Sequence, residues 1–81
     1  MPIISITTLL NLNQELNELS LPFKIHLRDA CGKQSFWIEA MEDSIHNSQY
    51  DSLYTTLEQF FHKERITLQY SDDKMSFWSI N

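Results

Sequence analysis

The sequence predicts a small α+β domain in which two helices cover one face of a four-stranded antiparallel sheet, in the order αββαββ. Each half of the 81-residue chain carries an apolar stripe with helical spacing, followed by two segments that alternate as strands do. The halves also match each other at an offset of 41 positions, with nine identities in 40 aligned pairs. Average composition gives roughly two or three identities. We therefore predict one domain, residues 1–81, built from a repeat of 1–40 and 42–81. The identical pairs are Ile4 and Ile45, Leu12 and Leu53, Leu16 and Leu57, Ile25 and Ile66, Leu27 and Leu68, Lys33 and Lys74, Ser35 and Ser76, Phe36 and Phe77, and Trp37 and Trp78.

The first helix is predicted between the N-terminal segment and Pro22. Thr7 or Thr8 is the expected N-cap, since hydroxyl side chains accept hydrogen bonds from the first free amides of a helix. Pro22 cannot donate to the helical ladder and disfavours helical geometry at Leu21, so the helix ends before it. The apolar stripe is Leu9, Leu12, Leu16 and Leu19.

The second helix repeats this pattern one unit later. Ser48 followed by Asp51 resembles a capping box, which predicts a start near Gln49. The stripe is Tyr50, Leu53, Leu57 and Phe60, widened by Tyr54 and Phe61. We interpret both stripes as core-facing.

Two strands follow each helix. Phe23, Ile25 and Leu27 alternate with polar residues, and 35–41 is the returning strand, with Gly32 in the turn between them. In the second half 66–70 and 75–80 form the corresponding pair around the turn 71–74. The prediction places the Leu27, Phe60 and Leu68 side chains in the core, together with Leu12, Leu16, Ile25, Phe36, Leu53, Leu57 and Phe77.

The two Ser-Phe-Trp strands are expected to meet at the centre of the sheet across a pseudo-twofold axis. This topology resembles a circularly permuted ferredoxin-like fold, with the first strand moved to the end of the chain. A fold analogy of this kind transfers no function. Two alternatives stay open at this point: the halves pack less symmetrically, or the sheet continues into a second subunit.

The alternation of the strands predicts which side chains lie on the face that the helices leave uncovered. If Ile25 and Leu27 point inward, then Phe36, Ile38 and Phe77 join them, and Trp37 and Trp78 point outward. Two tryptophans on an uncovered sheet would form an apolar patch of the kind that marks interfaces. The alternative is that a one-residue bulge, or the reverse facing of the strands, buries the tryptophans. The remaining residues predicted on this face are Lys24, His26, Arg28, Glu39, Thr67 and Gln69.

Charge and cysteine content narrow the class of protein. Eleven acids against six bases give a net charge of −5, which disfavours nucleic acid or anionic lipid as a partner because both are attracted by a positive field. One cysteine, Cys31, cannot form an internal disulfide, so a reducing cytoplasm is expected. The N-terminus lacks the charged and apolar regions of a signal peptide, and no apolar run reaches the ~18 residues of a membrane span.

A short motif lies at the predicted first turn. The string Arg28-Asp29-Ala30-Cys31, within Phe23 to Glu39, resembles small bacterial proteins named for the tetrapeptide RDAC. No activity is assigned to that family, so the resemblance implies no catalytic residues. The second half has Tyr70-Ser71-Asp72-Asp73 at this position, so the RDAC loop is the asymmetric element of a near-symmetric body.

Catalytic and metal chemistry find little support in the residue pattern. Cys31, His26 and Asp29 offer the residue types of a thiol nucleophile with its base, but no spacing that brings them together. His46 and His62 are separated by a helix and make no ligand spacing, so we expect neither a metal nor a cofactor. The acids Glu42 and Asp43, and likewise Asp72-Asp73, fit a solvated strand exit and a turn.

The sequence is therefore interpreted as a non-enzymatic interaction or regulatory protein. It would bind a protein partner, or a second copy of itself as a homodimer, through the open sheet face or the RDAC loop. Candidate binding residues are Trp37, Trp78, Lys24, His26, Arg28, Asp29, Cys31 and Gln69. The alternatives are binding of single-stranded nucleic acid by aromatics on the central strands and a thiol enzyme that uses Cys31.

Overall fold

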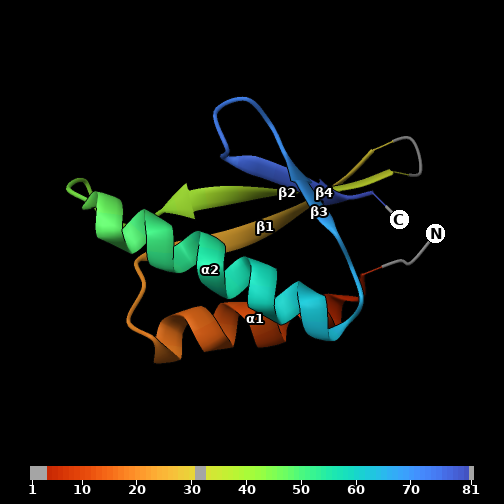
Figure 1. Cartoon of the computed structure of the whole chain (residues 1–81), viewed down its shortest axis with the longest axis horizontal. Coiled ribbons are helices and arrows are strands. Elements are labelled where there is room, and N and C mark those ends of the chain that lie inside the picture. The colour runs from red at the N-terminus through yellow and green to blue at the C-terminus, as the bar shows by residue number, and fades with distance from the viewer. Residues whose placement is uncertain (1–3, 31–32, 81) are drawn as a thin grey trace.

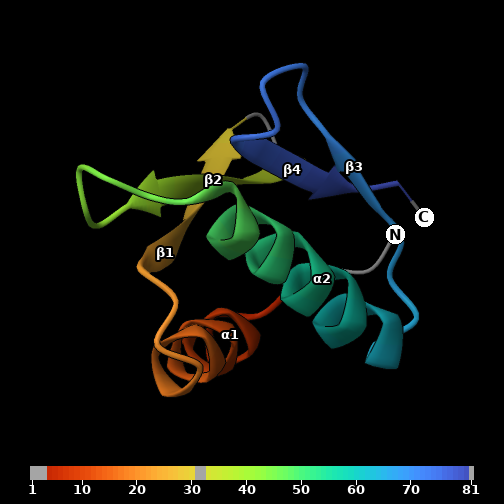
Figure 2. The ribbon, with the colours of Figure 1, turned by 60° about the vertical axis from the view of Figure 1, so that its left-hand side comes forward.

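The computed structural model describes residues 4–30 and 33–80 and confirms the α+β class and the element order αββαββ (Figure 1). Both helices lie on the same side of one sheet, as Figures 1 and 2 show from two directions. The elements are α1 (Ile6–Glu18), β1 (Phe23–Ala30), β2 (Lys33–Ala40), α2 (Asn47–Lys63), β3 (Leu68–Tyr70) and β4 (Ser76–Ser79).

The sheet is antiparallel with the strand order β1-β2-β4-β3. The two Ser-Phe-Trp segments therefore occupy its two central strands, as the sequence predicts. Phe36 of β2 lies directly opposite Phe77 of β4, and Trp37 lies opposite Ser76. Because Phe36 and Phe77 are 41 positions apart, the central register pairs positions that the sequence offset makes equivalent.

Helix α1 begins earlier than the sequence predicts. Its N-cap is Ser5, whose Oγ accepts a hydrogen bond from the backbone N–H of Thr8 at 3.1 Å. The prediction of Thr7 or Thr8 as the cap is wrong, because the helical period extends back to Ile6 and places both threonines in the first turn.

Helix α2 also begins earlier, at Asn47 with His46 as its N-cap. The capping interaction comes from Gln49, whose Oε1 accepts a hydrogen bond from the backbone N–H of His46 at 2.8 Å. The predicted Ser48 and Asp51 capping box is therefore wrong, since both residues lie inside the helix and Gln49 has taken the N3 role.

Both helices end in the same backbone motif. Ser20 (φ 57°) and Arg65 (φ 58°) adopt left-handed geometry just after the last helical turn. The next amides, of Leu21 and Ile66, then donate to the carbonyls of Leu16 and Phe61. This is the Schellman arrangement, which turns the chain from each helix into the following strand. Pro22, buried, follows the first of these motifs, where it cannot extend the helix.

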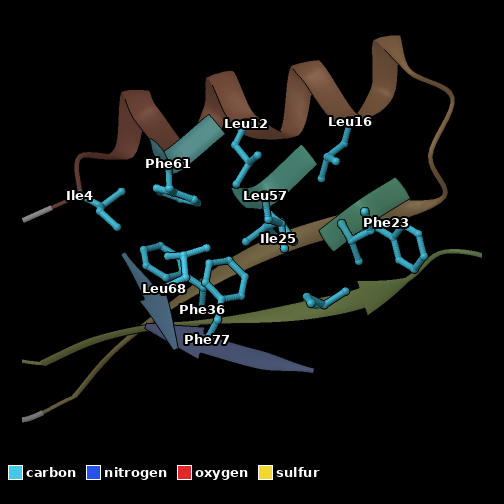
Figure 3. Packing of buried hydrophobic residues seen from close by; sticks show 12 residues of the cluster. Ile4, Leu12, Leu16, Phe23, Ile25, Phe36, Leu57, Phe61, Leu68 and Phe77 are labelled. Carbon is cyan, nitrogen blue, oxygen red and sulfur yellow. The ribbon is translucent and has the colours of Figure 1, made fainter. Parts of the chain in front are cut away.

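A single apolar cluster fills the space between the helices and the sheet (Figure 3). The stacked pair Phe36 and Phe77, with ring centroids 5.2 Å apart, forms its centre, and Phe61 of α2 contacts both rings. The prediction that Leu27 and Phe60 are largely buried is wrong, because both are only partly buried at its margin. The buried members are Ile4, Leu12, Leu16, Phe23, Ile25, Phe36, Ile38, Leu53, Leu57, Phe61, Leu68 and Phe77.

Strand boundaries differ from the sequence prediction at the first hairpin. β1 runs to Ala30, so Arg28 and Asp29 are strand residues paired with Ser35 and Gln34. The prediction that Arg28, Asp29 and Ala30 belong to the turn is therefore wrong. Cys31 and Gly32 lie outside the described residues.

Two amide side chains each bond to both the N–H and the carbonyl of one backbone residue, as a neighbouring strand would. Asn13 of α1 accepts from the backbone N–H of Ile25 at 2.8 Å and donates to its carbonyl at 3.0 Å. Gln34 of β2 makes the same pair of bonds to Ile4, at 2.8 and 3.0 Å. Asn13 therefore fixes α1 to the outer edge of β1, and Gln34 fixes the segment before α1 to β2.

Candidate functional site

The sheet face opposite the helices is the candidate site, and we call it the open face. Within residues 4–30 and 33–80, no helix or strand covers it (Figure 2). Phe36 and Phe77 point inward, and their side chains are 1% and 0% exposed. Because side chains alternate along a strand, the residues next to them point to the open face. The described side chains of the open face are Lys24, His26, Arg28, Ser35, Trp37, Glu39, Thr67, Gln69, Ser76 and Trp78.

The two tryptophans lie on the two central strands. Trp37 is 38% exposed, whereas Trp78 is half-buried beside Gln69 on the edge strand β3. Ser76 lies opposite Trp37, and Trp78 follows two residues later on the same face. The indoles are therefore diagonal neighbours, a separation of roughly 7 to 8 Å across an antiparallel pair.

Trp37 stacks against His26 of the neighbouring strand. The two ring centroids are 4.2 Å apart and the ring planes differ by 18°. His26 and Trp37 lie opposite each other in the register of β1 and β2. The imidazole thus covers one face of the indole, and in the register with β4, on the other side of β2, Ser76 lies opposite Trp37.

Glu39 holds the imidazole in this orientation. His26 donates from Nε2 to Oε1 of Glu39 at 2.7 Å, along the same two strands that carry the stack. The row Glu39, His26 and Trp37 is therefore a fixed arrangement of carboxylate, imidazole and indole. Sequence analysis placed all three residues on the open face but did not predict the interaction, because cross-strand register, which sets their contact, is only implicit in the sequence.

The open face is richer in cations than the molecule as a whole. Lys24 and Arg28 are exposed on β1, on either side of His26. Within the part of the chain that the structure describes, neither cation forms an ion pair. Glu39, which is bonded to His26, also lies opposite Lys24 in the register of β1 and β2, but the two side chains form no ion pair.

Asp29 follows Arg28 on β1. Asp29 pairs with Gln34 through the register of β1 and β2. Cys31 lies outside the described residues, so the Cys31 chemistry stays a prediction. His46 and His62 lie at opposite ends of α2. Within residues 4–30 and 33–80, no three His, Cys, Asp or Glu side chains lie close enough together to hold a metal ion. None of the helices in these residues is both long and apolar enough to cross a membrane.

A second polar cluster lies on the helix side of the sheet and fixes the β3–β4 turn. The Tyr54 hydroxyl donates to the carbonyl of Lys74 at 2.6 Å, and the Lys74 ammonium lies 5.2 Å from the Tyr54 ring centroid. The Tyr70 hydroxyl donates to Glu58. Burial, followed by the hydrogen bond to Glu58, raises the pKa of Tyr70 well above its usual value. These contacts join α2 to the last hairpin, so we interpret the cluster as structural.

The turn itself is stabilised by Asp73. Its carboxylate accepts from the backbone N–H of Met75 at 2.9 Å and from the Ser71 hydroxyl at 2.7 Å, and these bonds lower the pKa of Asp73. Lys74 between them adopts left-handed geometry with φ 61°. The acids of this turn therefore shape the hairpin, as expected for Asp in turns.

A shallow groove of about 440 Å³ lies between the C-terminal end of α1 and the outer side of α2. The Thr56 hydroxyl in it donates to the carbonyl of Ser52, one turn earlier. The lining consists of Leu19, Leu21, Asp51, Ser52, Thr55, Thr56 and Gln59. The groove lacks the aromatic and cationic groups that the open face combines.

Comparison of the chain with protein-family models, with curated proteins and with solved structures gave no match.

Proposed function

We propose that the protein is a non-enzymatic interaction protein that binds a protein partner through the open face. The observation that carries this proposal is the position of Trp37: a 38% exposed indole at the centre of an uncovered sheet. Large aromatic rings supply much of the binding energy at protein interfaces, and tryptophan is prominent among the residues that do so.

The fixed orientation of Trp37 supports the same function. The ring stacks on His26, and His26 is bonded to Glu39, so the indole is ordered before any partner arrives. Ordering a free side chain on binding costs about 0.5 to 1.5 kcal/mol. A ring that is already fixed avoids most of that cost.

Three further statements belong to this proposal. The body consists of two αββ copies, 1–40 and 42–81, in a permuted ferredoxin-like arrangement; the pairing of Phe36 with Phe77 supports this. The protein works in a reducing compartment such as the cytoplasm, as its single cysteine indicates. The RDAC loop at Cys31 is a secondary candidate for contact with the partner.

Binding of single-stranded nucleic acid is the second candidate, because the aromatics lie on the two central strands with Lys24 and Arg28 beside them. Bases stack on the flat face of an aromatic ring. One face of the Trp37 ring is covered by His26, and the molecule carries a net charge of −5. Both observations favour a protein partner.

The experiment is affinity capture from extract of the native host, with wild-type protein and the variant Trp37→Ala, Trp78→Ala as bait. The double variant is expected to lose the partner while it keeps the wild-type circular dichroism spectrum. Leu10→Ala is the matched control, since Leu10 is 62% exposed on the opposite side of the molecule. Cys31→Ser is expected to capture as wild type does.

Two results would contradict the proposal. In one, the double tryptophan variant captures the same proteins as wild type does. In the other, Leu10→Ala or Cys31→Ser loses the partner and the tryptophan variant keeps it, which would move the interface to α1 or to the RDAC loop.

A further inference from the structure

We propose that the partner presents an acidic segment to the open face, with carboxylates facing Lys24 and Arg28 and an apolar side chain against the free face of Trp37. This inference rests on the proposed function and specifies the chemistry of the partner. It goes beyond that function because partner binding alone requires no particular charge.

The charge distribution of the molecule supports an acidic partner. The chain is acidic overall, at −5, yet the described open face carries two cations and a single carboxylate, and that carboxylate is bonded to His26. Complementary potentials steer partners together and suppress wrong ones. The other described acids lie on the helices and connecting segments, away from this face: Glu15, Glu18, Glu42, Asp43, Asp51, Glu58, Glu64, Asp72 and Asp73.

The spacing of the cations defines the footprint. Lys24 and Arg28 lie on the same face of β1 four residues apart, which is roughly 13 Å along a strand. His26 lies between them, and Trp37 lies beside His26 on the next strand. An apolar anchor at Trp37 would therefore be flanked by two points of positive charge.

The free face of Trp37 provides the apolar contact. Ser76 of β4 lies directly opposite Trp37 in the register, and Trp78 is the diagonal neighbour on the same strand. A serine side chain is too short to cover an indole, and Trp37 is 38% exposed. A leucine-sized or aromatic side chain of the partner would bury apolar surface against this exposed ring, which favours binding.

A second copy of this chain fits the open face poorly. A twofold contact between two open faces would enclose two copies each of Lys24 and Arg28 in one interface, with only the two Glu39 carboxylates, already bonded to His26. Enclosing cations without opposing charges carries a large desolvation cost. The acidic partner supplies those charges.

The test is a binding titration of the full chain followed by tryptophan fluorescence. The probes are a short synthetic peptide of glutamates with two leucines, the same peptide with lysine at every glutamate position, and an oligothymidine of matched length. Lys24→Glu is the variant, and Lys63→Glu is the matched control, because Lys63 is exposed at the end of α2 and its reversal changes the net charge equally.

The glutamate peptide is expected to bind, and the lysine peptide is expected not to. Lys24→Glu should weaken binding about fivefold to tenfold, since one exposed ion pair contributes up to about 1 kcal/mol and the reversal adds repulsion. Lys63→Glu should change it less than twofold. Binding should weaken as ionic strength rises from about 0.1 M to about 1 M, where the Debye length falls from about 10 Å to about 3 Å.

The inference is overturned if the lysine peptide or the oligothymidine binds more tightly than the glutamate peptide, if the glutamate peptide does not bind in the millimolar range, or if Lys24→Glu and Lys63→Glu behave alike. A tryptophan emission spectrum of the free protein that changes on dilution would indicate self-association. That result would also overturn the inference, in favour of a second copy. Partner capture that is lost with Trp37→Ala, Trp78→Ala but unaffected by Lys24→Glu would refute the acidic segment alone and leave the proposed function standing.

Discussion

Asn13 allows a quantitative test of how the outer edge of β1 is closed. The perturbation is Asn13→Leu, which keeps similar volume on α1 but removes both hydrogen bonds to Ile25, the N–H···Oδ1 bond of 2.8 Å and the Nδ2–H···O bond of 3.0 Å. It also removes a weaker bond to the carbonyl of Leu9 at 3.3 Å. Leucine cannot replace any of these, so the amide and carbonyl of Ile25 lose their partner.

The expected cost follows from these two groups. A buried polar group left without a partner costs about 1 to 3 kcal/mol, and Ile25 is 1% exposed. Two such groups would cost up to about 6 kcal/mol, but the bonds are only partly buried and water can reach the outer edge of a sheet. We therefore expect a loss of about 2 to 4 kcal/mol in the free energy of unfolding, a large part of the stability of a domain of this size.

Urea unfolding followed by circular dichroism measures this loss, with Asn11→Leu as the matched control. Asn11 is exposed on the same helix, and its side chain forms no hydrogen bond or ion pair within the described residues. The control also corrects for helix propensity, since leucine is a better helix former than asparagine by up to about 0.5 kcal/mol. Equal unfolding midpoints for Asn13→Leu and Asn11→Leu would refute the role assigned to Asn13.

Two further predictions concern stability. Leu57→Ala should lower the free energy of unfolding by about 2 to 5 kcal/mol, because Leu57 is 0% exposed. Leu10→Ala, at a 62% exposed position, should change it by less than about 0.5 kcal/mol. Similar urea midpoints for the two variants would show that the helix faces are assigned wrongly. Burial and the Glu58 hydrogen bond raise the pKa of Tyr70 in the folded state, so folding favours the neutral phenol. The contribution of Tyr70 to the free energy of unfolding is therefore complete below the unfolded pKa of about 10 and is lost as pH rises above it. Unfolding midpoints measured between neutral and strongly alkaline pH should therefore fall less steeply for Tyr70→Phe than for wild type, and equal slopes would contradict this.

The coarse architecture follows from the sequence because it depends on periodicity. The alternation around Phe36 and Phe77 identifies the inward side of both central strands, and the structure places both rings at the centre of the core. The match at an offset of 41 positions brings the same two residues opposite each other. These features depend on local pattern and strand register, which a sequence contains.

Features that depend on contacts between distant residues could not be predicted in this way. Asn13 lies among polar residues on a helix, and only the position of β1 explains its amide. The choice of Phe61 over Phe60 for the core is similar: both follow Leu57 at helical spacing, but Leu53, Leu57 and Phe61 recur every four residues on the side that faces the sheet. The start of α1 was misplaced because Ser5, Thr7 and Thr8 are all suitable cap residues, and the start of α2 was misplaced because its N-cap, His46, is not a residue type preferred at that position.

The candidate site shows the same division. The exposure of Trp37 was predicted by alternation. Its stack on His26, and the bond of His26 to Glu39, depend on the exact register of β1 and β2. The local excess of cations was also hidden in the sequence, since a net charge of −5 says nothing about where the six bases lie.

The most direct measurement for the central claim is the emission spectrum of Trp37 in the variant Trp78→Phe, recorded free and with the captured partner. The account predicts long-wavelength emission that does not change on dilution of the free protein, because one indole face is open to solvent, and a shift to shorter wavelength when the partner covers the ring. Short-wavelength emission from the free, dilute protein, or a spectrum that the partner leaves unchanged, would contradict the claim that the open face is where this protein binds.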